Sequence, residues 1–232
     1  MAKGGKRYRA SAQLRNESKK YTLDEAITFL GNVKRAKFDE TINIAIRLGV
    51  DPKHADQMVR GSVLLPHGTG KSLRVLVIAK GDKEREAKEA GADITGAEDI
   101  LQKIQGGWFE FDKVIATPDM MGAVGKLGSV LGPRGLMPNP KMGTVTFEVE
   151  KAVKELKRGK VEFKVDKSGN VHTIIGKMSF KPEQIKENMQ TLMESVVKAK
   201  PSTSKGVYLR SVTLSPTMAP GIRLDPGIFS AT

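Results

Sequence analysis

The sequence contains no cysteine, which excludes thiol nucleophiles, disulfides, iron–sulfur clusters and cysteine-based zinc sites. No stretch approaches the ~18 uninterrupted apolar residues of a membrane span, and the N-terminus has no apolar signal core, so we expect neither a membrane span nor secretion. His54, His67 and His172 lack metal-ligand spacing, and no G-x-S-x-G elbow is present. We therefore expect no metal, no cofactor and no catalytic residues.

Acidic residues are in deficit, since 26 Asp and Glu stand against 39 Lys and Arg, for a net charge of +13. This surplus indicates a polyanionic partner, nucleic acid first, although a merely basic enzyme also fits it. Residues 67–159 carry 15 basic and 13 acidic side chains, and the rest of the chain carries 24 and 13. The polyanion-binding surface should therefore lie mainly outside residues 67–159.

The first part of the chain predicts a basic arm, one helix and one half-exposed strand. Residues 1–20 carry basic side chains against the single acid Glu17 and show no apolar periodicity, which indicates a basic, mobile arm. Thr22 and Glu25 form a capping-box pattern at the start of a helix over about 23–33. Over 41–48 apolar and polar residues alternate, which predicts a strand with one polar face available to a ligand.

The middle of the chain alternates between apolar strands and charged helices. Residues 75–79 form a continuous apolar run, typical of a parallel strand that helices cover on both faces. Helices are expected over about 82–90, 98–105 and 148–158 and from Pro118, with strands at Ile94 and over 112–116. The alternation predicts a small doubly wound α/β unit.

The last part returns to strands with two different faces. Residues 161–165 and 171–175, separated by a Lys-Ser-Gly-Asn turn, predict a hairpin. A helix follows, whose apolar stripe consists of Ile185, Met189, Leu192 and Val196. The final strand, about 206–214, changes its apolar face between Leu209 and Val212, so we expect a bulge.

Neither flanking piece contains enough elements to fold by itself. We therefore expect a two-domain α/β fold, in which residues 1–66 and 160–232 form a discontinuous, split α+β domain and residues 67–159 an inserted α/β domain. The chain crosses twice between the two, and parallel crossings make a natural hinge. The expected hinge residues are Pro66, His67, Gly68 and Gly159.

Two glycine-rich segments invite comparison with nucleotide-binding loops. Residues 68–72, GTGKS, match only the end of a P-loop, because Leu65 stands where that motif has Gly and a strand follows. We interpret this segment as a linker at the hinge. The glycines spaced every three or four residues over 122–132 do not form G-x-G-x-x-G after a first strand, so they indicate close helix packing.

Two loops carry unusual composition. Residues 132–145, GPRGLMPNPKMGTV, must form a shaped loop, because three prolines and three glycines restrict the backbone to few conformations. This loop could shape the inserted domain or contact RNA. Residues 214–221, LSPTMAPG, follow the last strand with hydroxyls and turn residues in place of charge, which fits either a plain turn or an RNA contact.

Several segments, in order, resemble the bacterial large-subunit ribosomal protein L1 family, the ribosomal stalk protein family. They are VRG at 59–61, LPHG at 65–68, the loop 132–145, IIGK at 174–177 and PTM at 216–218. The resemblance covers about residues 20–225. It implies a split RNA-binding domain with an inserted Rossmann-like, three-layer α/β domain.

The resemblance also implies a function. It implies a structural protein of the large ribosomal subunit, not an enzyme, that binds ribosomal RNA in the mobile stalk. It further implies that the protein contacts exit-site transfer RNA, helps its release, and represses translation of its own operon messenger RNA. The loop over 132–145 could then also face transfer RNA. We expect a cytoplasmic protein, monomeric outside the ribosome, with no membrane partner.

The resemblance assigns RNA contacts to ten residues, namely Lys37, Phe38, Thr41, Arg60, Lys164, Lys177, Ser211, Thr213, Thr217 and Met218. The residue types suit RNA, because Lys and Arg bind phosphate, an aromatic ring packs on a sugar or base, and hydroxyls reach 2′-hydroxyls. Burial in the core is the alternative for Phe38, and a solvated cation without an RNA contact is the alternative for Arg60 and Lys177. Ala219 departs from the family, which commonly has Gly after the Met, and a required positive φ there would disturb the loop.

Two other classes of function stay open at this point. One is an RNA-directed or nucleotide-using enzyme that holds its ligand in the inserted α/β domain. The other is a translational repressor that does not reside on the ribosome.

Overall fold

The computed structural model describes residues 5–33 and 36–229. The chain forms two compact units: unit 1 comprises Met1–Gly70 and Val161–Thr232, and unit 2 comprises Lys71–Lys160. Unit 1 has one hydrophobic core, whereas unit 2 has two buried clusters, one on each face of its sheet. The mixed α/β class expected from the sequence is confirmed, with antiparallel pairing in unit 1 and a parallel sheet in unit 2.

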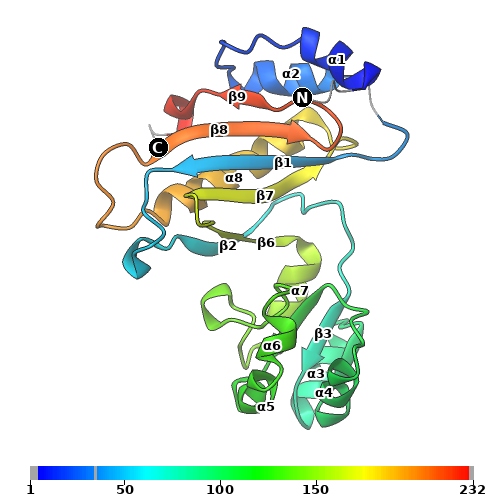
Figure 1. Cartoon of the computed structure of the whole chain (residues 1–232). Helices are drawn as coiled ribbons and strands as arrows, with labels where there is room; N and C mark the ends of the chain where they lie inside the picture. Colours follow the sequence, from blue (N-terminus) through cyan, green and yellow to red (C-terminus); the bar gives the residue numbers. More distant parts are fainter. Residues whose placement is uncertain (1–4, 34–35, 230–232) are drawn as a thin grey trace. The chain divides into compact units, whose positions relative to one another are not determined.

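Unit 1 is built on a four-stranded antiparallel sheet (Figure 1). Its order is β7 (Asn170–Lys177), β1 (Thr41–Leu48), β8 (Leu209–Pro216) and β9 (Ile222–Leu224). The predicted alternation of β1 is confirmed, because Ile42, Ile44, Ile46 and Leu48 are buried and the residues between them are not. One face of the sheet therefore joins the core, and the other carries the remaining side chains of β1.

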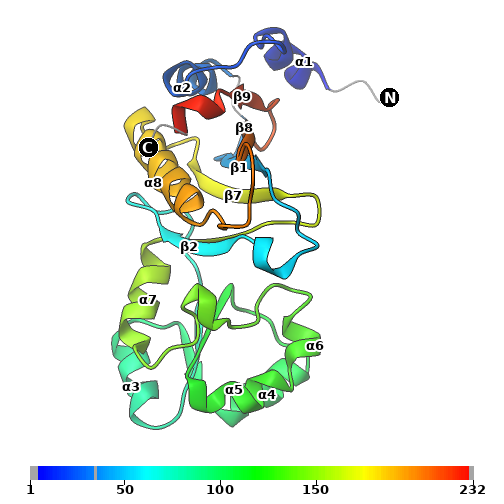
Figure 2. The ribbon, with the colours of Figure 1, turned by 90° about the vertical axis from the view of Figure 1, so that its left-hand side faces the viewer.

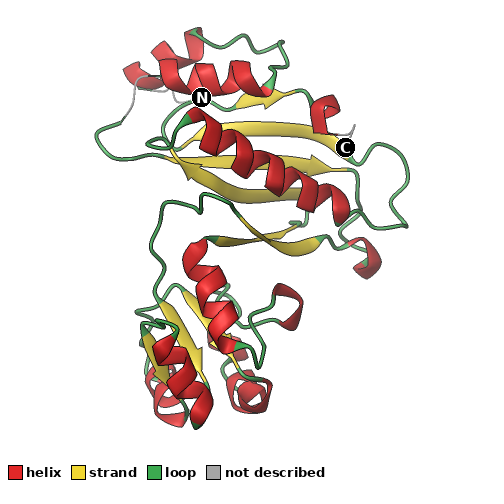
Figure 3. Ribbon diagram, turned by 180° about the vertical axis from the view of Figure 1, so that it is seen from behind, coloured by secondary structure: helices red, strands yellow, loops and turns green. Residues whose placement is uncertain are grey.

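Two helices cover the core face of this sheet. They are α2 (Leu23–Asn32) and α8 (Pro182–Lys198), and Figure 3 shows α8 lying across the strands. The predicted capping box starts α2, since Glu25 N–H donates to Thr22 Oγ1 and the Glu25 carboxylate accepts from Thr22 N–H. The predicted apolar stripe of α8 is buried. Both helices thus form where local sequence signals placed them.

The N-terminal segment contains a helix that its charge pattern did not predict. This helix, α1 (Lys6–Gln13), is polar almost all round, with only Ser11 buried. In Figure 2, α2 and α8 lie on one side of the sheet, and α1 lies beyond its β9 edge. Residues 1–4 of the predicted arm lie outside the described residues.

The predicted hairpin of the last part is wrong in its pairing. The turn is present, because Asp166 N–H donates to Asn170 O at 2.7 Å, and Val165 forms a bridge with Val171. Beyond that bridge the strands separate, since β6 (Lys160–Lys164) pairs with β2 (Arg60–Leu64) in a second sheet while β7 joins β1. Strand partners far along the chain displaced the local hairpin.

The predicted bulge in the final strand is confirmed. Arg47 pairs with Ser211, and the next residue, Leu48, pairs with Leu209, so the register of β8 shifts around Arg210. The strand begins at Leu209, later than predicted, and Val207 is 72% exposed. The shift keeps both Leu209 and Val212 in the core despite their odd spacing.

Unit 2 contains a parallel three-stranded sheet of order β4 (Ile94–Gly96), β3 (Val75–Ile78) and β5 (Lys113–Ala116). Figure 2 shows α3 (Asp82–Glu89) and α7 (Val149–Arg158) on one side of it. On the other side lie α4 (Glu98–Gln105), α5 (Met121–Gly125) and α6 (Gly128–Leu131). The apolar run of β3 is completely buried because helices cover both of its faces.

The proline-rich loop packs onto unit 2 as a continuation of its sheet. The helix expected from Pro118 is a short 3-10 turn, Pro118–Met120, followed by the two short helices α5 and α6. Beyond them, Val145 forms a parallel bridge with Ala116. Thr144 Oγ1 accepts from Asn139 N–H at 2.8 Å and closes the end of the loop around a 3-10 turn, Pro140–Met142.

Candidate nucleic-acid interface

The candidate interface is the face of the four-stranded sheet turned away from α2 and α8, called here the open face (Figure 1). Neighbouring strands place Asn43 opposite Ser215, Ala45 opposite Thr213, and Arg47 opposite Ser211. On β7, the other neighbour of β1, His172 lies opposite Ala45, and on β9 Arg223 lies opposite Thr213. The exposed or half-buried side chains of this face are Asn43, Ala45, Arg47, His172, Ile174, Ser211, Thr213, Ser215 and Arg223.

Three predicted residues meet at one end of the open face, where β1 begins and β7 and β8 end. Thr41 N–H donates to Thr217 Oγ1 at 3.2 Å, and that hydroxyl donates to Thr41 O at 3.2 Å. Lys177 Nζ donates to Thr41 Oγ1 at 2.8 Å. The Thr217 hydroxyl therefore joins the terminal loop to β1, and only its remaining lone pair is available to an RNA hydroxyl.

Two loops lie beside this end of the sheet, one before β1 and one after β8, and a buried carboxylate binds both of them. Glu40 is 2% exposed, and its Oε1 accepts from Ala36 N–H at 2.8 Å while its Oε2 accepts from Met218 N–H at 2.8 Å. Asp39 accepts from the N–H and the hydroxyl of Ser179 at 3.1 and 2.8 Å. No local pattern of the sequence marks Glu40, because Met218, one of its two partners, lies 178 positions away.

The side chains at the tip of these loops point into solvent. Phe38 is 54% exposed and Met218 is 60% exposed, and Lys37, which precedes Phe38 in the sequence, is also exposed. The alternative that Phe38 belongs to the core is therefore wrong. Large apolar side chains that stay exposed next to cations are typical of a surface that binds a partner.

Ala219 does not distort the terminal loop. Within residues 5–33 and 36–229 no residue other than glycine has a positive φ, so Ala219 adopts an ordinary backbone conformation. The loop therefore does not need a glycine at position 219.

Two predicted RNA-binding residues lie away from that end of the open face. Arg60 is the first residue of β2 and Lys164 the last of β6, and both are exposed on the two-stranded sheet. Val165 N–H donates to Val59 O at 2.9 Å, which places these two cations beside each other on adjacent strands. They form a separate basic pair on unit 1.

Two of the predicted hinge residues, His67 and Gly68, are bonded to α8. The fully buried Asn188 accepts from His67 N–H at 3.0 Å and donates to Gly68 O at 2.9 Å and to Ile175 O at 2.8 Å. His67 Nε2 lies 2.6 Å from Glu187 Oε2. Gly159 ends α7 with φ 103°, a left-handed conformation that favours glycine.

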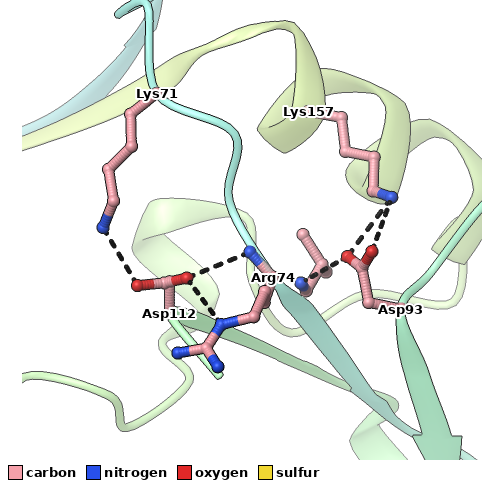
Figure 4. Close-up of polar contacts among 6 residues, drawn as sticks. Lys71, Arg74, Asp93, Asp112 and Lys157 are labelled. Carbon is pink, nitrogen blue, oxygen red and sulfur yellow. Dashed lines mark hydrogen bonds and ion pairs between the residues drawn. The ribbon is translucent and has the colours of Figure 1, made fainter. Parts of the chain in front are cut away.

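The GTGKS segment leads into a strand held by ion pairs (Figure 4). Lys71 Nζ donates to Asp112 Oδ1 at 3.0 Å, and Arg74 donates to Asp112 Oδ2 from its backbone N–H at 3.1 Å and from Nε at 3.3 Å. The Lys71 hydrogen bond, followed by that of the Arg74 N–H, lowers the pKa of Asp112 to about 2. Lys71 thus pairs with a carboxylate, and β3 follows in place of the helix that a P-loop requires.

Figure 4 also shows a second carboxylate of unit 2 bound by its own neighbours. Asp93 accepts from Val75 N–H at 2.9 Å and pairs with Lys157 at 3.2 Å. Over the part of the chain that the structure describes, no three His, Cys, Asp or Glu side chains gather as a metal site would require. Nor does any helix in that part have the length and apolarity to cross a membrane.

One comparison with known protein families bears on this geometry. The model described as the ribosomal protein L1p/L10e family matches residues 30–220. The match includes all ten predicted RNA contacts, from Lys37 to Met218, together with the whole of unit 2. It stops short of the N-terminal segment and of β9.

Proposed function

The chain belongs to the ribosomal protein L1p/L10e family, and we propose that it binds large-subunit ribosomal RNA in the stalk with the open face of unit 1. It is a structural, RNA-binding component of the ribosome and not an enzyme, as its family is. The earlier alternative, an RNA-directed or nucleotide-using enzyme, does not fit such a family.

The observation that carries the proposal is the group of side chains at one end of the open face. Phe38 and Met218 are exposed there, Lys37 lies beside Phe38, and Lys177 lies within hydrogen-bond distance of Thr41. Glu40 fixes both loops from beneath. An apolar side chain on a fixed loop can pack on a sugar or base, and the adjacent cations can neutralise phosphates.

Recognition on this face has two components. Loop backbone groups and the hydroxyls of Ser211 and Thr213 read the shape of the RNA and its 2′-hydroxyls. Lys37, Lys177 and the separate pair Arg60 and Lys164 add phosphate contacts, whose contribution falls as salt rises. Selectivity for the stalk RNA should therefore persist at salt concentrations that remove non-specific binding.

The finer roles rest on the same site. We propose that unit 1 is the discontinuous RNA-binding domain and unit 2 the inserted Rossmann-like domain, with the hinge at Pro66, His67, Gly68 and Gly159. The protein contacts exit-site transfer RNA and helps its release. It represses its own operon messenger RNA, because an RNA that mimics the ribosomal site occupies the same face.

Competition binding tests the proposal directly. The full-length protein is titrated with a large-subunit stalk RNA fragment in the presence of an unrelated RNA hairpin, at low and at high salt. We expect the stalk RNA to keep its advantage as salt rises. If binding of both RNAs falls equally as salt rises, the net charge of +13 attracts RNA only non-specifically.

Sedimentation separates ribosomal residence from repression alone. If the protein resides on the ribosome, it should co-sediment with large subunits after a high-salt wash. A repressor that does not reside there would bind its messenger RNA and leave the subunits under the same wash.

A further inference from the structure

A basic hollow lies beside the open face, at the edge formed by β9. It has a volume of about 330 Å³ and is lined by Arg15, Asn16, Glu17, Ser18, Lys19, Gly221 and Arg223. Three of these residues are cations and one is a carboxylate, so the lining carries a net positive charge. The ten predicted RNA contacts do not include any of them.

Arg15 holds the base of the hollow. Its Nη1 donates to Gly221 O at 2.7 Å across 206 positions of sequence, and its Nη2 pairs with Glu17. Its Nε is buried and has no hydrogen-bond acceptor among the residues that the structure describes. Glu17 is 80% exposed, against 22% for Arg15, so this ion pair is a weak surface interaction that another anion can displace.

The other two cations flank the opening from different elements. Lys19 donates to Glu25 Oε1 at 2.8 Å, and this hydrogen bond raises its pKa, which keeps the ammonium charged. Arg223 is exposed on β9 and lies opposite Thr213 of β8. Because residues directly opposite in an antiparallel pair share one face, Arg223 belongs to the open face and to the hollow at once.

Gly221 brings the backbone close to that same face. A Cβ added at this position would lie 2.8 Å from Thr213 Cγ2, so only glycine fits here without displacement of the Thr213 side chain. A row of residues thus runs across the sheet from His172 through Ala45 and Thr213 to Arg223, and ends at the hollow.

We propose that the hollow is a phosphate-binding site, in which Arg15, Lys19 and Arg223 receive a backbone phosphate of the RNA that lies on the open face. The inference rests on the proposed function. A phosphate group offers two oxygens to an Arg fork as a carboxylate does, and in the proposed complex it replaces Glu17 as the partner of Arg15. The site lies outside the residues that the family model matches, 30–220, so it extends the interface beyond them.

The test uses substitutions that should change the affinity for stalk RNA in opposite directions. Each variant of the whole chain is titrated with the stalk RNA across a range of salt concentrations. Arg223→Gln and Lys19→Gln should each weaken binding about three- to tenfold at low salt and reduce the slope of log K against log salt by roughly 0.7–0.9. Glu17→Gln should strengthen binding several-fold, because it removes the competing carboxylate.

Matched controls change the same charges elsewhere on unit 1. Lys205 and Glu183 are exposed and do not line the hollow, so Lys205→Gln and Glu183→Gln account for the change in net charge alone. Thermal unfolding followed by circular dichroism verifies that each variant folds.

The outcomes separate the two proposals. If the wild-type protein does not prefer stalk RNA, the proposed function fails, and this inference fails with it. If the wild type prefers stalk RNA but the hollow variants behave as their controls do, RNA binding stands and the phosphate site is overturned. Opposite effects of Arg223→Gln and Glu17→Gln, each larger than its control, support the site.

Discussion

The buried carboxylate of Glu40 accepts a hydrogen bond from the backbone N–H of Met218 at 2.8 Å, and so joins the loop before β1 to the loop after β8. Its other oxygen accepts from Ala36 N–H, so one side chain sets the separation of the two loops. We therefore regard Glu40 as a positioning residue of the candidate interface, which acts through Phe38 and Met218.

Glu40→Gln tests this positioning role. A glutamine keeps the size of the side chain but has one acceptor oxygen, so one of the two backbone N–H groups loses its partner. We expect the affinity for stalk RNA to fall about tenfold, with about 1–3 kcal/mol lost from the free energy of unfolding. Filter binding and urea denaturation measure the two effects. Unchanged affinity in a destabilised variant would restrict Glu40 to a role in folding.

Thr217 and Met218 should contribute to affinity through different physics. Thr217→Val removes both hydrogen bonds to Thr41 and should weaken the specific RNA several-fold, with little effect on stability because the residue is exposed. Met218→Asp should weaken it more, because a carboxylate repels the phosphates, whereas Met218→Leu should retain most of the affinity. A titration in which Met218→Asp binds as the wild type does would remove the terminal loop from the interface.

Asp112 should make the stability of unit 2 depend on acid. Its pKa is lowered in the folded protein to about 2, so its contribution is present above the unfolded value near 3.8 and disappears as the pH falls through about 2. We expect Asp112→Asn to cost about 1–2 kcal/mol at pH 7, a value reduced for the exposure of Lys71 and Arg74, and the cost to vanish between about pH 4 and pH 2.

Trp108 provides the signal for this measurement. It is the single tryptophan of the chain, and its ring lies 5.5 Å from that of Phe111, next to Asp112. Urea unfolding followed by tryptophan fluorescence therefore reports on unit 2. The control is Asp119→Asn, an exposed carboxylate that should change stability by less than about 0.5 kcal/mol. A cost of Asp112→Asn that is the same at pH 2 and pH 7 would contradict the assignment.

Replacement of Thr173 by an apolar residue of the same shape should stabilise unit 1. Its hydroxyl is buried in the core of unit 1 and has no hydrogen-bond partner within residues 5–33 and 36–229. Thr173→Val keeps the shape and removes the unsatisfied group, so we expect a gain of about 1 kcal/mol in the free energy of unfolding, read by far-UV circular dichroism in urea. A loss of stability would mean that the hydroxyl has a partner, such as a buried water.

Asn188 should be among the least replaceable residues of α8. Asn188→Leu leaves the His67 N–H and the carbonyls of Gly68 and Ile175 without their partner, at an expected cost of about 2–4 kcal/mol. Thr191→Ala is the control on the same helix, because its hydroxyl donates to Glu187 O one turn earlier. Equal costs for the two variants would show that the three bonds of Asn188 do not stabilise the segment before unit 2.

Local sequence signals predicted most of the elements correctly. The capping box at Thr22, the alternation of β1 and the apolar stripe of α8 depend on residues within a few positions of one another. The bulge in β8 was also readable, because Leu209 and Val212 cannot share a face without one. The expected hairpin of β6 and β7 does not form, because β6 pairs with β2 and β7 pairs with β1.

The sequence by itself determined most helices and strands, the basic charge and the family, because spacing, capping and motif order are properties of the chain alone. Only the tertiary structure decided that Glu40 meets Met218 and that Arg15 meets Gly221, across 178 and 206 positions of sequence. No local pattern encodes such pairs. They arise when packing of the core brings distant strands into register, and the open face and its basic hollow exist only after that has happened.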